Sequence, residues 1–354
     1  MNAEFIGALE EIEKGKGISK EIIFEALESA LISSYKKNFG SSQNVEVEID
    51  RNTGKVNVFA KKIVVSEVKD NLLEIDIEEA KKIDEKYQIG DTVIIEVTPK
   101  NFGRIAAQTA KQVVIQRIKD AERDVIFEEF ISRENEIITG MVQRISKNNA
   151  YIDLGKAEGI LPPAEQIEGE IYHQGDRIKL YILEVKKTSK GPQIILSRSH
   201  PGLVKRLFEL EVPEIHEGIV DIYSISREAG SRTKIAVYSK DPNVEPVGAC
   251  VGFKGSRVKA IVEELNGEKI DIIVWNKNID EFIANSLSPS NVVDVLIDEK
   301  NKSALVIVPD YQLSLAIGKG GQNARLAAKL TNWKIDIKSE SQYKESQNDE
   351  DIIS

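Results

Sequence analysis

Two short glycine turns carry the residues best placed to do chemistry in this chain. Each has the pattern G-x-x-G, at residues 252–255 and 318–321, and each contains a lysine and leads into a helix-like segment. The first turn of a helix presents unpaired N–H groups and a partial positive charge, which together favour anions. Because glycine lacks Cβ, a sugar-phosphate backbone could approach such a loop closely. The pattern therefore predicts two phosphate-binding loops.

The residues around the glycines supply cations and hydrogen-bond donors. Lysine and arginine add positive charge, and Ser, Gln and Asn at a helix start can cap the helix or donate to phosphate. Such a loop would hold the backbone of a few unpaired nucleotides while the bases lie across the adjoining groove. The predicted RNA-binding residues are Gly252, Phe253, Lys254, Gly255, Ser256 and Arg257 in the first loop, and Gly318, Lys319, Gly320, Gly321, Gln322, Asn323 and Arg325 in the second.

A single G-x-x-G is a weak signal, because two glycines also make an ordinary tight corner between helices. Two nucleotide-cofactor interpretations fail on spacing. The chain has no G-x-x-x-x-G-K-[ST], and Asn323 stands where a dinucleotide-binding G-x-G-x-x-G starting at Gly318 needs its last glycine. The occurrence of two loops in matching contexts favours RNA binding.

The two loops belong to an internal repeat. CVGFKGSRVKAIVEELNGEKIDI (250–272) aligns with AIGKGGQNARLAAKLTNWKIDI (316–337), and strand-like sequence precedes each copy. Each unit therefore reads strand, helix, loop, helix, strand, with SLSPSNV (286–292) as the joint. The repeat predicts two tandem α+β modules, over 201–284 and 285–340.

The rest of the chain predicts two further domains and a tail. Five short strand-like runs separated by Gly, Pro and Asn predict a five-stranded OB-type β-barrel over 135–200, although a meander or sandwich would have the same composition. Residues 1–132 read as helices, a small sheet and a long helix from about residue 104 to 131. The sequence thus predicts a multidomain α+β protein that ends in a disordered acidic tail, 341–354.

The net charge of −10 lies mostly at the two ends of the chain. Residues 1–134 hold 20 Lys+Arg against 26 Asp+Glu, and residues 341–354 hold 1 against 4, so the middle is nearly balanced. One cysteine, Cys250, and three scattered histidines argue against a disulfide framework and a structural zinc site. No apolar stretch approaches the roughly 20 residues of a membrane span. We expect a cytoplasmic protein with no cofactor, metal or membrane partner.

Several segments resemble the NusA family of bacterial transcription factors. The most similar are NFGRIAAQTAKQVVIQRIKDAERD, ELNGEKIDIIVW, SLSPSNV and AIGKGGQNARLAAKLTNWKIDI, and the order of an N-terminal domain, an S1-like barrel and two KH-like modules matches over about residues 1–340. The resemblance implies type II KH domains and a non-enzymatic, monomeric regulator. Its N-terminal domain would bind RNA polymerase core, and its other domains would bind nascent single-stranded RNA and RNA hairpins. It would promote pausing and hairpin-dependent termination, and take part in antitermination with other Nus factors.

The resemblance also points to residues outside the loops. Arg104 and Lys111 share a face of the long helix and would contact RNA hairpins, although a solvated helix surface explains them equally well. The S1-like barrel has Pro162 in the usual histidine position, so its stacking platform is incomplete. Tyr151 is either a barrel residue or a base stacker, and Lys187 would attract RNA by its charge.

Two other classes of function share these RNA-binding modules. A nuclease would need clustered carboxylates for metal ions, and the acids of residues 1–134 instead alternate with lysines on helix faces. We therefore do not expect an enzyme. An S1/KH accessory factor in RNA processing or ribosome assembly is the alternative to a transcription factor.

Overall fold

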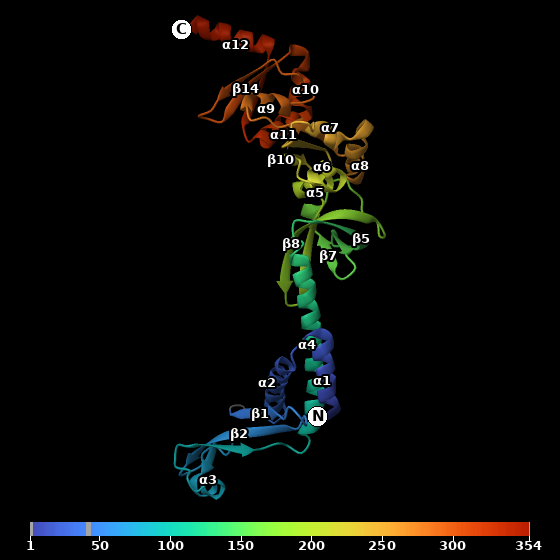
Figure 1. Ribbon diagram of the computed structural model, residues 1–354. Coiled ribbons are helices and arrows are strands. Elements are labelled where there is room, and N and C mark those ends of the chain that lie inside the picture. The colour runs from blue at the N-terminus through green and yellow to red at the C-terminus, as the bar shows by residue number, and fades with distance from the viewer. Residues whose placement is uncertain (1–2, 40–43, 354) are drawn as a thin grey trace. The chain divides into compact units, whose positions relative to one another are not determined.

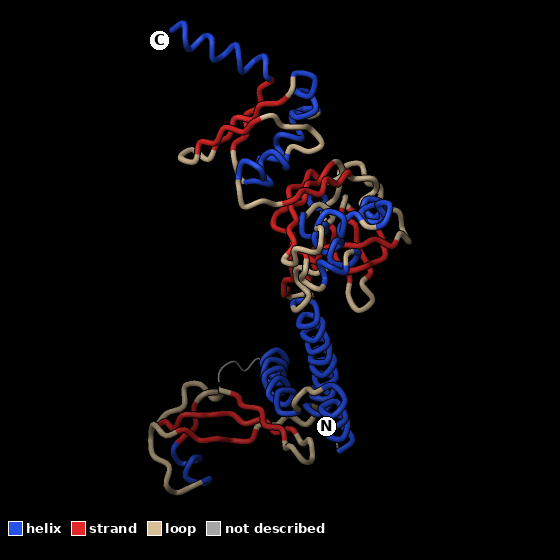
Figure 2. The backbone as a smooth tube through the Cα atoms, turned by 45° about the horizontal axis from the view of Figure 1, so that its top comes forward, coloured by secondary structure: helices blue, strands red, loops and turns tan. Residues whose placement is uncertain are grey.

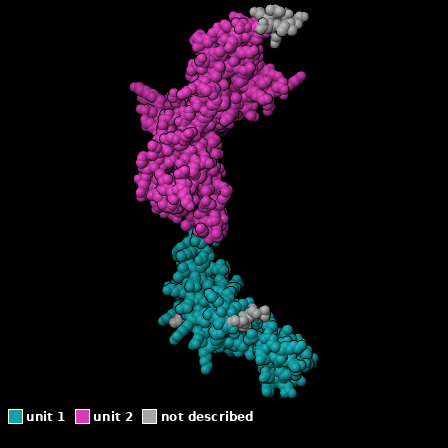
Figure 3. Space-filling view, turned by 180° about the vertical axis from the view of Figure 1, so that it is seen from behind, with its two compact units in different colours: residues 1–125 teal, residues 126–354 magenta. Residues whose placement is uncertain are grey.

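The computed structural model describes residues 3–39 and 44–353. These fall into two compact units, Met1–Val125 and Ile126–Ser354, which Figure 3 shows in different colours. Each unit is described by itself below.

The first unit combines helices with a small sheet. Helices α1, α2 and the first part of α4 surround a core that includes Leu9, Phe24, Leu27, Val58 and Phe102. Strand β2 pairs antiparallel with β1 and β4 and parallel with β3. The elements are α1 (Ala3–Lys16), α2 (Lys20–Phe39), β1 (Val45–Ile49), β2 (Val56–Val65), β3 (Glu74–Asp76), α3 (Ile77–Ile83), β4 (Thr92–Glu96) and α4 (Phe102–Ile131) (Figure 1).

Helix α4 confirms the predicted long helix. Phe102, Ala106 and Ala110 recur every four residues and are all buried, because this spacing places them on one face of a helix. Arg104 and Lys111 are exposed on the same helix.

The second unit begins with a closed five-stranded barrel, as the strand spacing predicts. Its order is β5-β6-β7-β9-β8, and β8 pairs with β5 to close the ring. Gly140 has no room for a side chain, because an added Cβ would lie 2.3 Å from Cγ2 of Ile152. The strands are β5 (Ile137–Ser146), β6 (Asn149–Asp153), β7 (Glu158–Leu161), β8 (Arg177–Thr188) and β9 (Gly191–Ser197).

Two modules of the same topology follow the barrel and confirm the internal repeat. In each three-stranded sheet the middle strand is antiparallel to the first and parallel to the third, with helices packed beside the sheet (Figure 2). The order helix–strand–strand–helix–helix–strand is that of a type II KH domain. The first module comprises α5 (Pro201–Glu211), α6 (Pro213–His216), β10 (Val220–Glu228), β11 (Arg232–Ser239), α7 (Pro246–Val251), α8 (Ser256–Glu264) and β12 (Lys269–Val274). The second comprises α9 (Ile279–Ser286), β13 (Asp294–Asp298), β14 (Ser303–Val308), α10 (Leu313–Ile317), α11 (Gln322–Thr331) and β15 (Lys334–Ser339).

The boundary between the modules differs from the predicted one. The boundary predicted between residues 284 and 285 falls inside α9, whose Ile283 is buried in the core of the second module with Leu287, Val306 and Ala327. The segment 286–292 therefore lies inside the second module, and the joint precedes α9. The local periodicity of α9 shows an apolar face but cannot show which sheet that face covers.

The C-terminal segment also differs from the expectation of disorder. Residues Glu340–Ile353 form helix α12. Its first turn is held by Asp310, whose carboxylate accepts hydrogen bonds from the backbone N–H of Ser341 at 3.1 Å and from its hydroxyl at 2.7 Å. Asp310 thus caps the helix from 31 residues away, a contact that sequence spacing does not reveal.

A buried ion-pair network joins the barrel to the first KH module. Arg198, only 1% exposed, donates to the carboxylate of Glu170 and, at 3.2 Å, to that of Glu264. It also donates to the backbone oxygen of Lys179 at 2.9 Å. Because a buried guanidinium needs such partners, these contacts fix the barrel against α8.

Candidate nucleic-acid interface

The first glycine loop, residues 252–255, is a chain reversal that only particular residues can make. Gly252 has φ 73° and ψ 179°, a conformation essentially reserved for glycine. Lys254 (φ 50°) and Gly255 (φ 77°) are left-handed, and α8 starts directly after them. An added Cβ on Gly252 would lie 2.7 Å from Cγ of Arg257. The loop thus combines a forced turn with the open N-terminus of a nine-residue helix.

The second loop, residues 318–321, has the same backbone. Gly318 (φ 77°, ψ 169°), Gly320 (φ 58°, ψ 27°) and Gly321 (φ 77°, ψ 13°) repeat the angles of Gly252, Lys254 and Gly255. The lysines do not coincide, because Lys254 corresponds to Gly320 while Lys319 corresponds to Phe253. Each loop therefore presents one lysine, but from a different position of the turn.

Five of the predicted RNA-binding residues are exposed at the tips of the loops. Phe253 is 82% exposed, and Lys254, Ser256, Lys319 and Gly320 are also exposed. The Lys254 ammonium lies 5.4 Å from the centre of the Phe253 ring. An accessible cation and an aromatic face beside the start of a helix form a surface that suits a phosphate and an adjoining base.

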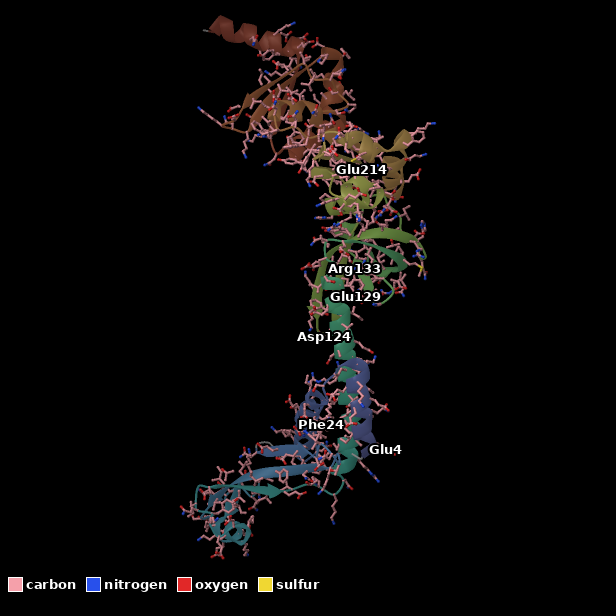
Figure 4. The ribbon with its side chains drawn as sticks, viewed as in Figure 1. Glu4, Phe24, Asp124, Glu129, Arg133 and Glu214 are labelled. Carbon is pink, nitrogen blue, oxygen red and sulfur yellow. The ribbon has the colours of Figure 1, made fainter. Side chains whose placement is uncertain are left out.

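Three other residues of the predicted set already have partners in the protein. Arg257 donates to Glu214, labelled in Figure 4, at 2.8 Å and to the backbone oxygen of Ala249 at 2.6 Å. Arg325 donates to Glu228 of the first module at 2.9 and 3.1 Å. Gln322 donates to the same carboxylate at 2.8 Å. The expectation that these side chains are mobile donors for phosphate needs correction, because each is bound to its own protein.

Glu228 was missed by the sequence analysis, and it changes the charge of the second loop. The hydrogen bond from Gln322 and the ion pair with Arg325 hold the pKa of Glu228 below its usual value. Glu228 is therefore ionised at neutral pH and offsets the charge of Arg325. The two residues are 97 positions apart, so no sequence pattern could have paired them.

Asn323 is the clearest correction. It is only 4% exposed, and its Nδ2 donates at 3.0 Å both to the backbone oxygen of Leu287 and to that of Ala316. The side chain therefore ties α11 to the end of α9 and to α10. An exposed phosphate on the loop tip would not reach it.

The predicted barrel residues have neighbours that limit their roles. Tyr151 is half-buried, and the Arg144 guanidinium lies 3.6 Å from the centre of its ring. Arg144 also donates to Glu158 at 2.9 and 3.0 Å. One face of Tyr151 is thus covered by a cation, so base stacking there requires the other face or displacement of Arg144. Lys187 is exposed, with its ammonium 5.8 Å from the ring centre of Phe127.

No group of three His, Cys, Asp or Glu side chains within residues 3–39 and 44–353 is placed to hold a metal ion. Among the helices described there, none combines the length and the apolar character needed to cross a bilayer.

Comparison with known proteins decides the family. Family models match four successive stretches: the NusA N-terminal domain over residues 4–124, the S1 RNA binding domain over 132–199, and the NusA-like first and second KH domains over 198–275 and 279–345. The transcription termination/antitermination protein NusA of Bacillus subtilis (strain 168) is 62% identical over 345 residues, which cover 98% of this chain and 93% of that protein. The chain belongs to the NusA family.

A second curated relative agrees with this assignment. The transcription termination/antitermination protein NusA of Halalkalibacterium halodurans is 61% identical over 345 residues, covering 98% of this chain and 90% of that protein. A solved structure, the solution structure of the N-terminal domain of NusA from B. subtilis, is 63% identical. It covers 35% of this chain and 99% of that one, with a TM-score of 0.32. The NusA-like KH models end at residue 275 and resume at 279, on either side of the joint that precedes α9.

Proposed function

We propose that this chain is a transcription elongation factor that binds RNA polymerase and the RNA emerging from it. Residues 1–132 would bind polymerase core, and the barrel and the two KH modules would hold single-stranded RNA and RNA hairpins. Through these contacts the protein would lengthen pauses, promote hairpin-dependent termination and take part in antitermination with other Nus factors. Because it would act on transcription of the bacterial chromosome, the protein would lie in the cytoplasm. It would regulate transcription without itself cleaving or forming bonds in RNA.

One observation carries the proposal. NusA proteins named for termination and antitermination are about 60% identical to this chain over nearly its full length. The similarity therefore extends over all four domains. The geometry of the two glycine loops supports the RNA-binding half. Both loops adopt the same backbone conformation, and both leave a lysine and a helix N-terminus accessible.

The N-terminal unit would add contacts to RNA hairpins. Arg104 and Lys111 are exposed on α4, as contact with RNA hairpins would require. Mutation of both residues distinguishes a contact with hairpins from a solvated surface. Replacing both residues with Ala should shorten hairpin pauses while leaving polymerase binding intact.

A purified transcription reaction tests the proposal. A template with a hairpin-stabilised pause is transcribed by bacterial RNA polymerase with and without the full chain. We expect the pause half-life to increase in its presence, and co-sedimentation to show the chain bound to polymerase. Identical half-lives at saturating protein, or no co-sedimentation, would refute the proposed function. Shortening of labelled RNA in magnesium buffer would instead reveal a nuclease.

A further inference from the structure

The sheet of the first KH module has two faces, and the second module covers one of them. Ala236 of β11 and Ile273 of β12 lie on that face and form a small buried cluster with Phe282 of α9 and Leu330 of α11. Helix α11 also packs against strands β10 and β11 (Figure 1). Apolar contacts of this kind hold two surfaces together, but they are non-directional, so they do not by themselves select one orientation.

A lysine is buried on the same face. Residues two apart on a strand share a face, so Lys234 of β11 lies beside Ala236. Lys234 is 0% exposed, and its ammonium donates at 2.9 Å to the carboxylate of Asp271 on β12 and at 2.7 Å to the backbone oxygen of Ser288. Ser288 follows α9 and belongs to the second module. The lysine therefore makes a directional contact between the modules, because a hydrogen bond weakens steeply as it bends.

Other polar contacts also cross the junction, but they are more exposed or involve neutral groups. Arg325 pairs with Glu228, and 52% and 27% of these side chains are exposed, so water screens their attraction. The hydroxyl of Ser224 donates at 2.9 Å to the backbone oxygen of Leu330, a bond between neutral groups. The Lys234 ammonium differs, because water cannot replace a lost partner at a fully buried charge. A shift of the second module would therefore be most costly at Lys234.

Stability alone does not account for a lysine at this place. Burial lowers the pKa of Lys234, and the negative charge of Asp271 acts in the opposite direction. Asp271 also pairs with Arg232, at 2.7 and 2.8 Å, so it does not depend on Lys234 for a partner. An apolar residue would avoid the cost of burying an ammonium, and replacing buried ionic groups with apolar residues of similar volume is often neutral or stabilising.

The internal repeat shows that a KH sheet does not need a lysine here. Lys234 pairs with Asp271 in the register of β11 and β12, and Leu305 pairs with Asp336 in the equivalent register of β14 and β15. Leu305 thus stands in the second module where Lys234 stands in the first, although the two sheets have the same strand order. In the first module, this place faces Ser288 of the other module. The lysine therefore belongs to the junction and not to the KH fold.

We propose that Lys234 is a positioning residue that fixes the orientation of the second KH module on the first, and so sets the two glycine loops relative to each other. Apolar contacts supply the attraction at the junction, and the lysine selects one arrangement of it. A single buried polar residue fixes the register of a coiled coil in the same way, at a cost in stability. The effect on RNA rests on the proposed RNA-binding function, whereas the orientation is a property of the chain alone.

The repeat also supplies the test variant. Lys234→Leu introduces the residue that the second module has at the equivalent place, and Asp271 keeps Arg232 as its partner. Arg232→Met is the matched control, because it removes a cation from the same carboxylate. Within the described residues the Arg232 side chain hydrogen-bonds only to Asp271, so the contact between Lys234 and Ser288 remains. Both variants should melt within about 4 °C of wild type, because neither leaves Asp271 unpaired.

Pulsed electron–electron double resonance measures the orientation directly in the full chain. Nitroxide labels are attached to Lys259→Cys on α8 and to Lys300→Cys in the turn between β13 and β14, two exposed places, while Cys250 is buried and stays unlabelled. We expect one narrow distance distribution for the otherwise wild-type chain and for Arg232→Met. Lys234→Leu should widen it at least about twofold or add a second peak, because further arrangements become populated. Equal distributions in all three chains, or equal widening in both variants, would overturn the proposal.

RNA binding gives the functional readout, measured by fluorescence anisotropy with an unstructured RNA long enough to meet both loops. Loosening the junction lowers the effective concentration of one loop for a strand held by the other, so Lys234→Leu should weaken binding about 5- to 20-fold. If the wild-type chain binds no RNA, the proposed function fails, while the distance measurement still tests the orientation. Unchanged RNA affinity beside a widened distance distribution would overturn the role of Lys234 in RNA binding.

Discussion

Gly320 is the best position at which to test whether phosphate sits on the second loop. Its left-handed backbone (φ 58°, ψ 27°) nearly equals that of Lys254 (φ 50°, ψ 31°) in the first loop, where a long side chain is accommodated. An added Cβ on Gly320 meets no heavy atom of the described residues within 4 Å. The left-handed region costs most L residues about 1–2 kcal/mol, and Asp and Asn adopt it more readily because their short polar side chains can form local hydrogen bonds. Gly320→Asp should therefore fold and place a carboxylate where the phosphate would lie.

The expected loss follows from Coulomb's law. Two like charges about 4 Å apart repel by about 1 kcal/mol in water and by about 4 kcal/mol at the effective dielectric of a protein surface. For an exposed loop we take about 1–3 kcal/mol, which corresponds to about 5- to 150-fold weaker binding. Gly320→Asn is the matched control, since it has the same shape and backbone preference without the charge. It should change the affinity about 2-fold or less.

Fluorescence anisotropy with a fluorescein-labelled, unstructured 12-nucleotide RNA at about 0.1 M salt provides the assay. Thermal melting checks the fold of both variants. Gly318 would be a poor choice, because an added Cβ would lie 2.8 Å from the backbone nitrogen of Asn323. A loss of binding there would report damage to the module. If Gly320→Asp and Gly320→Asn bind RNA as tightly as wild type, no phosphate sits on this loop and the reasoning fails.

Three further predictions follow from contacts that the structure shows. Lys319→Ala should weaken RNA binding about 5-fold or more, whereas Arg325→Ala should change it about 2-fold or less, because Glu228 already neutralises Arg325; the reverse order in the same anisotropy assay would contradict this. Arg198→Met should lower the free energy of unfolding of the second unit by about 3–5 kcal/mol, because Glu170 would stay buried without its partner. Arg133→Met breaks the exposed ion pair between Arg133 and Glu136 and should lower the free energy of unfolding by less than about 1 kcal/mol. Equal urea midpoints for Arg198→Met and Arg133→Met would refute this difference between a buried and an exposed ion pair. Burial raises the pKa of the Cys250 thiol to about 12, so it is protonated at pH 8 and should react with Ellman's reagent only after denaturation; rapid reaction of the folded chain would show that the thiol is accessible.

The sequence predicted those parts of the fold that follow from an internal repeat or from a local pattern of residues. The two KH modules followed from the matching glycines, because only particular residues can adopt the positive φ angles that both loops require. The five strands of the barrel followed from short strand-like runs separated by Gly, Pro and Asn, although that pattern also suited a meander or a sandwich. The long helix α4 followed from a helix-like run. These patterns are local, so no knowledge of the tertiary structure was needed.

The sequence could not show which side chains were already bound within the protein. Arg257 pairs with Glu214 across 43 positions, and Arg325 pairs with Glu228 across 97, so both looked like free cations. Asn323 looked like a donor at a helix start until the packing of α9 buried it. The boundary predicted between residues 284 and 285 cuts through α9 for the same reason. In each case the deciding contact joins segments that are distant along the chain.

Crosslinking in a paused transcription complex tests the central claim most directly. Nascent RNA carrying 4-thiouridine is irradiated in a complex of polymerase and the full chain, and the crosslinked peptides are identified by mass spectrometry. Crosslinks to residues 252–257 and 318–321 are the predicted result. Crosslinks confined to other parts of the chain, with both glycine loops unmodified, would contradict the claim that these loops hold the emerging transcript.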